Sequence, residues 1–562
     1  MTSNIRYLLH QKILDILQQK SLKNGNIAFP LHLQYDRTIG KFAYLLPTKA
    51  QSYNIENIVS DLINDRSEDI IENIMLKSDT IYFNLYKEKF IKHILENNFS
   101  FVSPPHIGSP RNIIVEFSSP NIAKPFHMGH LRSTMLGNYV SNINYFLKNQ
   151  VKRINYLGDW GTQFGLIDLG INLAEISEKE IEDNPIEALY KAYISANKKA
   201  ELDSKILDQA RAIFRQLETG NAVVSDKWQR FRHYTIEELR RTYNRLGVTF
   251  DEYQWESMHK AENIQKLLHE MRQMKILKKG EDNKEIVDLH IKPVPILKSD
   301  GTTLYIARDI AAAIDRYNKN IFDKMYYVVD HSQAEHFCNL IMILEKMGMP
   351  WSNKLEHISF GRVVGMTTRK GNVTFLKDIL DKTRDSVREI QKANSTTRAS
   401  LDSSDTTADI LGVSAIIIND FKYRRDKNYT FNWNSVFDIK GNTGIRLQYS
   451  HCRLVSLEQN SGATLVTECL PCLLNQPIID DLIFVMGQFD EAVIKSYEEL
   501  EPCILTKYLF DLSQSINRTW KALPVKGEPT DIASQRLLLF YTAKNILAQG
   551  MKLLGLTPLD KM

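Results

Sequence analysis

The sequence predicts an α/β protein built around a parallel sheet, with a smaller α+β unit before it and an all-helical region after it. The first observation is a strand pattern at 113–117, a helical pattern at 130–147 and a second strand pattern at 150–157. Such a β-α-β unit implies parallel strands. The second observation is a separate helix-and-strand pattern before residue 108, and the third is helical periodicity from about Ile410 to the end.

Composition excludes several classes of protein. Hydrophobic residues make up 43% and charged residues 25% of the 562 residues, which is typical of globular chains and not of disordered, collagen-like or coiled-coil ones. No apolar run reaches the roughly 18 residues that a membrane-spanning helix needs. The 71 basic and 67 acidic residues leave a net charge of +4, which by itself does not indicate nucleic-acid binding.

The five cysteines favour a reducing environment rather than a disulfide framework, given the length of the chain. The single close pair, Cys469-x-x-Cys472, lacks the second pair of ligands that a structural zinc site requires. We therefore expect no protein-bound structural metal.

The N-terminal unit, 1–108, is expected to contain a first helix, a second helix at 55–76 and a strand at 81–85. The Pro- and Ser-rich stretch 103–110 predicts a linker after it. The first 23 residues carry four Lys or Arg against one acidic residue. This pattern fits either a plain first helix or an amphipathic organelle-targeting segment.

The central unit, 109–436, contains the β-α-β pattern, and ligands are expected at the carboxyl ends of its parallel strands. A charged and mostly helical stretch at about 171–280 predicts an insertion into the sheet. Strand patterns then return at 303–307 and 324–330, and the polar run 394–407 predicts a loop.

The sharpest local signal is Pro125-Phe126-His127-Met128-Gly129-His130, where the first strand gives way to the first helix. A helix N-terminus favours phosphate through its N–H groups and its dipole. His127 and His130 can donate to an α-phosphate as charge develops during nucleotidyl transfer, and Gly129 lets an adenine ring approach the backbone. Alone, the motif equally fits two ordinary loop histidines.

The surrounding motifs resemble the class I arginyl-tRNA synthetases. They are VEFSSPNIAKPFHMGHLRST at 115–134, NYLGDWGTQFG at 155–165, GTTLYIARD at 301–309, GNTG at 441–444 and GLTPLDKM at 555–562. The resemblance covers most of the chain from about residue 111 to its end. It implies a Rossmann-type catalytic domain with a helical insertion, a small α+β N-terminal domain that contacts tRNA, and an all-α anticodon-binding domain at 437–562.

Class I synthetases usually carry a second motif, Lys-Met-Ser-Lys-Ser, whose lysine contacts the ATP phosphates. The counterpart here is Met366-Thr367-Thr368-Arg369-Lys370, which departs from that pattern. In similar departures within the family, a lysine just before the histidine motif supplies the charge, and Lys124 occupies that place. Arg369 and Lys370 remain alternatives, because a mobile cation needs only to reach the phosphates.

Recognition of arginine requires carboxylates that pair with a planar guanidinium. The resemblance implies that Glu116, Tyr305 and Asp309 hold the guanidinium, with Tyr305 in a strand-like segment. Read without the resemblance, Tyr305 is a core aromatic and Asp309 a helix cap. The resemblance also assigns the α-amino and α-carboxylate groups to Ser119, Asn121, His130 and Gln333.

The resemblance implies ATP-dependent formation of arginyl-adenylate and transfer to the 3′ end of arginine tRNA, with a tRNA-dependent first step. ATP is expected to enter with Mg²⁺ bridging its phosphates. A catalytically silent tRNA-binding paralogue is the alternative, and a small-molecule nucleotidyltransferase would not need the C-terminal helical domain. We expect a monomer without membrane attachment. The motif pattern resembles mitochondrial members from animals, so a mitochondrial matrix location is expected and a cytoplasmic one stays open.

Anticodon bases are expected on aromatic or apolar side chains. The resemblance implies such contacts at Tyr449, Trp520 and Met562, matched to relatives by their spacing from the C-terminus, and each residue equally fits core packing. Phosphate contacts are expected from Arg446, Arg453, Lys422 and Arg424. In the N-terminal unit, Tyr82-Phe83-Asn84-Leu85 is either a tRNA-contacting strand or a purely structural one.

Overall fold

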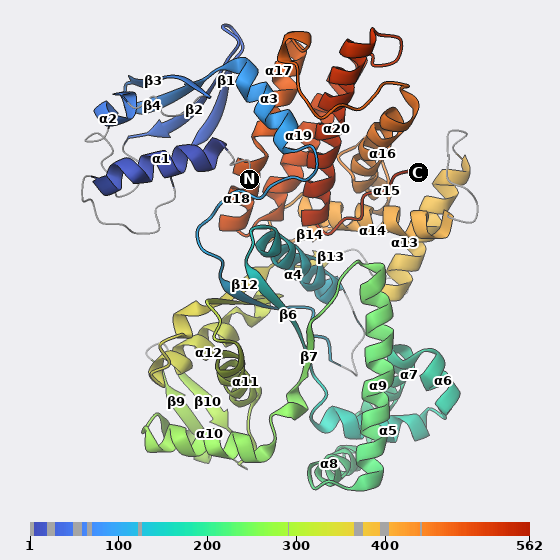
Figure 1. The fold of residues 1–562 in the computed structure, drawn as a ribbon. Helices are drawn as coiled ribbons and strands as arrows, with labels where there is room; N and C mark the ends of the chain where they lie inside the picture. The colour runs from blue at the N-terminus through green and yellow to red at the C-terminus, as the bar shows by residue number, and fades with distance from the viewer. Residues whose placement is uncertain are drawn as a thin grey trace.

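A computed structural model describes most of the chain (Figure 1). The residues described are 5–19, 29–48, 59–64, 70–121, 126, 128–289, 292–299, 301–364, 375–393, 404–438 and 441–562. Within them, no helix is long and apolar enough to cross a membrane. The α/β class predicted above is confirmed.

The N-terminal unit is a four-stranded antiparallel sheet with helices around it. Its strands pair in the order β1-β2-β4-β3. Their bounds are β1 His32–Asp36, β2 Lys41–Pro47, β3 Ile71–Lys77 and β4 Thr80–Leu85, and the helices are α1 Ile5–Gln19, α2 Val59–Asn64 and α3 Lys87–Asn97. The strand expected at 81–85 is confirmed. The helix expected at 55–76 is wrong over 71–76, because these residues pair with β4 and long-range strand pairing overrides local periodicity.

The centre of the molecule is a five-stranded, all-parallel sheet in the order β12-β11-β5-β6-β7. The strands are β5 Asn112–Glu116, β6 Gln150–Leu157, β7 Glu252–Trp255, β11 Lys324–Asp330 and β12 Leu355–Phe360. Helix α4, Met128–Phe146, joins β5 to β6. The strand order reverses between β5 and β11, and ligands of doubly wound sheets bind at the carboxyl ends of the strands at that point. The parallel sheet is therefore confirmed, and its topology locates the site.

The insertion between β6 and β7 consists of five helices, seen in Figure 1 on the opposite side of the central strands from α10–α12. They are α5 Thr162–Leu173, α6 Glu178–Asp183, α7 Pro185–Leu202, α8 Lys205–Glu218 and α9 Ala222–Arg245. The expectation of helices up to 280 needs correction, since β7 lies inside that stretch and pairs with β6. A four-residue edge strand that starts with a glutamate has too little apolar alternation to be recognised locally.

A second small sheet precedes α11. Its antiparallel strands are β8 Leu277–Lys279, β9 Glu285–Asp288 and β10 Pro293–Leu297, and the neighbouring helices are α10 Ala261–Gln273, α11 Tyr305–Asn320 and α12 Ala334–Lys346. The strand expected at 303–307 is wrong, because α11 begins at Tyr305. Ile306, Ala307 and Ile310 are all buried on one face of that helix, which three apolar residues alone could not distinguish from a strand.

The C-terminal region is helical, as expected. The short strand β13 Val363–Val364 comes before α13 Leu376–Ala393 and α14 Ser404–Phe421, and it pairs with β14 Tyr429–Thr430, which follows them and precedes α15 Trp433–Val436. The final helices are α16 Gly444–Asn460, α17 Pro477–Gly487, α18 Phe489–Glu498, α19 Pro502–Ala522 and α20 Thr530–Leu553. Of the loop expected at 394–407, residues 394–403 lie outside the described residues, and α14 already begins at Ser404.

The N-terminal unit packs on the C-terminal helices, beside α17 in Figure 1. Asp480 of α17 is buried and accepts hydrogen bonds from Lys87 Nζ at 2.6 Å and Tyr35 OH at 3.0 Å. Arg37 adds an ion pair with Asp481 at 2.9 Å. Two segments far apart in the sequence are thus joined by charge as well as by apolar packing.

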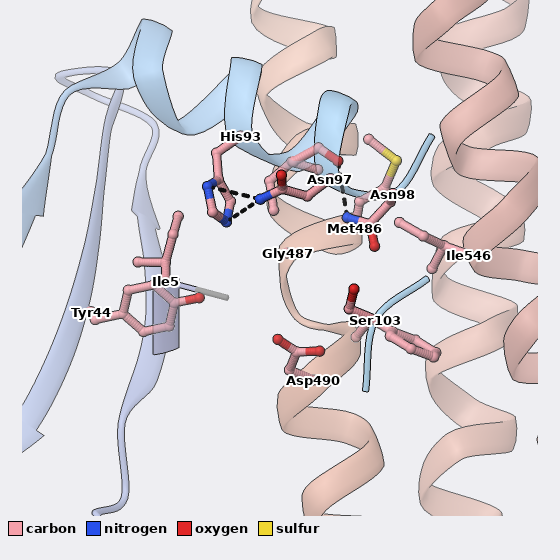
Figure 2. Close-up of a pocket in the computed structure, with 12 residues that line it drawn as sticks. Ile5, Tyr44, His93, Asn97, Asn98, Ser103, Met486, Gly487, Asp490 and Ile546 are labelled. Carbon is pink, nitrogen blue, oxygen red and sulfur yellow. Dashed lines mark hydrogen bonds between the residues drawn. The ribbon is translucent and has the colours of Figure 1, made fainter. Parts of the chain in front are cut away.

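A small cavity lies in this junction. Figure 2 shows its lining from α1, β2 and α3 on one side and from α17, α18 and α20 on the other. Burial lowers the pKa of His93 to about 4, so this histidine is neutral near pH 7. At about 40 Å³ the cavity is far below the roughly 300 Å³ of small-molecule sites and suits a few waters. The junction is therefore structural, and the functional site lies elsewhere.

Candidate functional site

The turn after β5 forms the floor of the site. Ser118 and Ser119 both have left-handed backbones, with φ of +71° and +45°, a conformation that costs roughly 1–2 kcal/mol per residue for non-glycine residues. Ser133 Oγ of α4 accepts the Ser118 N–H at 2.9 Å and donates to Val328 O of β11 at 2.6 Å. Asn155 Oδ1 of β6 accepts the Ser119 N–H at 3.1 Å. The strained turn is therefore held by α4 and by both strands next to β5.

A close approach brings Asn121 to the end of β6. Asn121 and Gly158 form a parallel β-bridge, and the Gly158 N–H donates to Pro120 O at 3.4 Å. A Cβ atom on Gly158 would lie 1.9 Å from Asn121 Oδ1. The glycine is therefore required for Asn121 to sit where the resemblance expects an amino-acid contact.

The histidine motif meets the first turn of α4, which contains Gly129 and His130. These two residues therefore lie at a helix N-terminus, the position that favours anions and on which the expectation of a phosphate site depends. His127, Lys124 and the expected ATP loop, Met366 to Lys370, lie outside the described residues.

A buried ion pair fixes α4 from its other side. Arg132, two residues after His130, lies 2.9 Å from Asp420 of α14 and donates to the carbonyls of Gly361 at 2.6 Å and Lys427 at 3.0 Å. Both charged side chains are almost fully buried. The helix that carries His130 is therefore tied to the two segments that precede β13 and β14.

Glu116, the last residue of β5, does not stand alone. Its carboxylate accepts a hydrogen bond from Nη1 of Arg316 of α11, and both side chains are buried. Burial raises the pKa of Glu116, and Arg316 opposes that shift. Burial would lower the pKa of Arg316, but Glu116 outweighs it and the net shift is upward. The two side chains are joined by this hydrogen bond, so a guanidinium of the protein already lies against one of the carboxylates expected to bind arginine.

Arg316 is enclosed by polar and aromatic groups. Its guanidinium carbon lies 4.9 Å from the ring centre of Tyr156 and 6.0 Å from that of Tyr327. Its Nε donates to Gln254 Oε1 of β7 at 2.8 Å. These contacts come from β6, β11 and β7. The guanidinium of α11 is therefore buried against three strands of the central sheet rather than exposed to solvent.

Asp309 is the second carboxylate of the site. It lies one turn after Tyr305 and two turns before Arg316, so that all three residues share one face of α11. Asp309 Oδ2 lies 2.7 Å from His336 Nε2 of α12. Its charge also raises the pKa of Glu116, which puts the two carboxylates within electrostatic reach of each other.

Tyr305 and Gln333 are exposed, unlike the other described residues expected to bind arginine. Tyr305 is the first residue of α11 and is 63% exposed, so it is not a core aromatic. Gln333 follows β11 and is exposed at the N-terminus of α12. Because β11 and β5 are neighbours, Gln333 and Ser119 follow adjacent strand ends at the point where the sheet order reverses. Gln333, Ser119 and Glu116 thus follow or end neighbouring strands of the sheet, and Asp309, which lies inside α11, is no helix cap.

Comparison with known proteins agrees with this arrangement. Residues 91–433 match the family model "tRNA synthetases class I (R), catalytic domain", and residues 447–562 match "DALR anticodon binding domain". Relatives named "Probable arginine--tRNA ligase, mitochondrial" from Bos taurus and Homo sapiens are each 39% identical, over 88% of either chain. The chain belongs to the class I arginyl-tRNA synthetase family.

Other members of this family match as well. A Dictyostelium discoideum protein named "Probable arginine--tRNA ligase, cytoplasmic" is 40% identical over 81% of this chain and 82% of its own. The arginyl-tRNA synthetase from Thermus thermophilus has the same fold, with a TM-score of 0.82 over 99% of this chain and 100% of its own at 20% identity.

The family's anticodon-binding region contains a cluster on α16 and α19. The guanidinium of Arg453 lies 5.6 Å from the ring centre of Tyr449 and 4.7 Å from that of Trp520. Tyr449 is 43% exposed, so its ring is open to a partner. Met562 is partly buried and packs near α13 and α14. The structure thus joins two of the three expected anticodon residues through an arginine.

The expected phosphate contacts differ in their surroundings. Arg424 already faces Glu501 at 3.4 Å, and burial lowers the pKa of Lys422. The Arg446 side chain donates to Oδ1 of the neighbouring Asn442 at 3.2 Å. In the N-terminal unit, Phe83 and Leu85 are buried in the sheet, whereas Tyr82 is half-buried beside Lys77.

Two residues of the site escaped sequence analysis. Arg316 follows Asp309 by seven residues and His336 follows Gln333 by three, spacings that place each pair on one helical face. That periodicity is the only local signal. It does not show that Arg316 meets a residue 200 positions away, which is a consequence of the sheet order.

Proposed function

We propose that this chain is an arginine–tRNA ligase that activates L-arginine with ATP and transfers it to the 3′ end of arginine tRNA. In the first step the arginine carboxylate attacks the α-phosphorus and pyrophosphate leaves. In the second, a terminal ribose hydroxyl attacks the activated carbonyl and AMP leaves. The protein contributes positioning and charge stabilisation rather than a covalent intermediate.

The observation that carries the arginine specificity is the pair of carboxylates at the strand crossover. Glu116 pairs with Arg316 at the end of β5, and Asp309 lies on the same face of α11 as Arg316 and contacts His336. We assign the substrate guanidinium to Asp309 and Glu116, with Tyr305 one turn before Asp309 on the same helical face. Its α-amino and α-carboxylate groups would reach Ser119, Asn121, His130 and Gln333.

Phosphate binding is assigned to the first turn of α4. His130 and Gly129 lie there, and we assign His127 and Lys124 to the same phosphates from the family pattern. Met366, Thr367, Thr368, Arg369 and Lys370 are assigned to the ATP loop on the same basis. Mg²⁺ would enter with ATP as part of the substrate and would neutralise charge on its phosphates.

The tRNA is proposed to contact both ends of the chain. Tyr449, Trp520 and Met562 are the proposed anticodon contacts, and Tyr82 is the one aromatic of its strand with surface to offer the tRNA body. This assignment follows a division into 1–108, 109–436 and 437–562. We propose that the enzyme acts as a monomer, and in mitochondria, since several similar proteins are named mitochondrial, although others are named cytoplasmic.

The test is ATP–pyrophosphate exchange with arginine, run with and without arginine tRNA. Exchange only when tRNA is present is the expected result. Absence of exchange in both reactions, with tRNA still bound, would instead identify a catalytically silent tRNA-binding protein. Glu116→Gln serves as the matched inactive control, since it removes the charge and keeps the shape.

A further inference from the structure

The side chain that contacts Asp309 is His336, the third residue of α12. Nε2 of His336 lies 2.7 Å from Asp309 Oδ2, and the two side chains are 26% and 25% exposed. The proposed function gives this same carboxylate to the substrate guanidinium, so the argument below rests on it. A histidine is the one side chain here whose ordinary pKa lies near physiological pH.

The charges around His336 are few. Asp309 of α11 and Glu116 of β5 are the acidic groups that act on it, and Glu116 is already matched by Arg316. Phe337 contacts its ring edge-on, and on the far side of Phe337 lies His357 of β12. Across Asp309 stand Tyr156 and Tyr327, whose pKa values burial raises, and His259, whose pKa burial lowers. On α12 itself, the adjacent Glu335 is exposed and pairs with Lys292.

The protonation of His336 therefore decides the net charge that meets the substrate. With neutral His336, the two carboxylates and Arg316 sum to one negative charge, which matches one guanidinium. With protonated His336 the sum is zero, and Asp309 already has a cationic partner. Repulsion between protonated His336 and the substrate guanidinium is poorly screened in a half-buried site. Arginine affinity therefore differs strongly between these two states.

We propose that His336 is a positioning residue for arginine recognition: in its neutral form it donates from Nε2 to Asp309 and orients that carboxylate, and in its protonated form it competes with the substrate guanidinium. Arginine binding is then linked to the release of a proton from His336. The site then binds most tightly a substrate that itself carries a positive charge to pair with Asp309.

The shift of the histidine's own pKa supports this geometry. Burial lowers the pKa of His336, but the hydrogen bond to Asp309 and its charge outweigh burial, and the net shift is upward. This upward shift favours the protonated form when no arginine is bound. As the pH falls through this raised pKa, the competent fraction falls, and the apparent KM for arginine rises by about tenfold per pH unit below it.

The experiment measures KM for arginine and kcat in aminoacylation of arginine tRNA by the full-length enzyme from pH 6 to 8.5. His336→Gln keeps a donor near the position of Nε2 but cannot titrate. We expect the KM for arginine of the wild type to rise at low pH and that of His336→Gln to change much less. The pH dependence of kcat should be the same in both enzymes. His357→Gln is the matched control, because it makes the same change beside the same Phe337, and it should follow the wild type.

Parallel pH profiles for the wild type and His336→Gln would overturn the proposal, as would a defect confined to kcat. If His336→Gln does not fold, calorimetry of the wild type with its tRNA decides: arginine binding in buffers of different ionisation enthalpy should release part of one proton, and none released would refute the linkage. Asp309→Asn separates the two proposals. Unchanged kcat/KM for arginine in that variant would reject the arginine site itself, whereas a large loss with parallel His336 profiles would reject only the role of His336.

Discussion

Removal of Arg316 is expected to be among the most damaging single changes to the central sheet. The guanidinium is 1% exposed and Glu116 is 4% exposed, so Arg316→Met would leave a buried carboxylate without its counter-charge. Breaking a buried pair in this way costs about 3–5 kcal/mol. Glu116→Gln should cost less, because Arg316 keeps Gln254 and the faces of Tyr156 and Tyr327.

The stability of Arg316→Met should depend on pH in a direction that the structure fixes. Without Arg316, burial raises the pKa of Glu116 in the folded protein above its unfolded value. A raised folded pKa means that the stability is present in acid and is lost as the pH rises through that pKa. Arg316→Met should therefore be closest to the wild type near pH 5 and lose stability toward pH 8.

The assay is urea unfolding followed by tryptophan fluorescence. Four of the six tryptophans lie between residues 160 and 351, so the signal reports mainly on the central unit. The double variant Glu116→Gln/Arg316→Met should recover a large part of the loss, because it removes both charges. A loss below about 1 kcal/mol in Arg316→Met, or strictly additive losses in the double variant, would refute the reasoning.

Three further predictions concern the remaining parts of the site. Asp309→Asn should lower kcat/KM for arginine, which corresponds to a loss of about 2–5 kcal/mol of transition-state stabilisation. The KM for ATP should stay near the wild-type value. Gly158→Ala should cost about 1–3 kcal/mol of stability and raise the KM for arginine, because the new methyl group overlaps Asn121; a fully active, equally stable variant would contradict the close approach. Arg453→Ala should weaken tRNA binding by about 1–2 kcal/mol through loss of the cation that orders Tyr449, as measured by filter binding at fixed salt. Unchanged tRNA affinity would remove this cluster from the interface.

Local sequence patterns correctly predict elements that have a sustained hydrophobic pattern or a short, distinctive motif. The strand at 150–157 and the strand at 324–330 have the bounds expected for them. Two other segments were mistaken for the opposite type. Residues 71–76 form a strand because β4 pairs with them, and Tyr305 begins a helix because the residues after it bury one face of α11. In both cases the deciding partner lies outside the window that a local pattern covers.

The amino-acid sequence by itself determined the family, the α/β class and the parallel sheet, because these depend on motifs and on periodicity. It also proposed the candidate site residues, whereas the point at which the strand order reverses came from the structure. Only the tertiary structure decided how the charges of the site are distributed. Glu116 meets Arg316 because β5 and α11 are brought together by the sheet order, and Asp309 meets His336 because α11 packs on α12. Electrostatic energy depends on distance and burial rather than on position in the chain, so no spacing could have revealed which carboxylate already has a cation beside it.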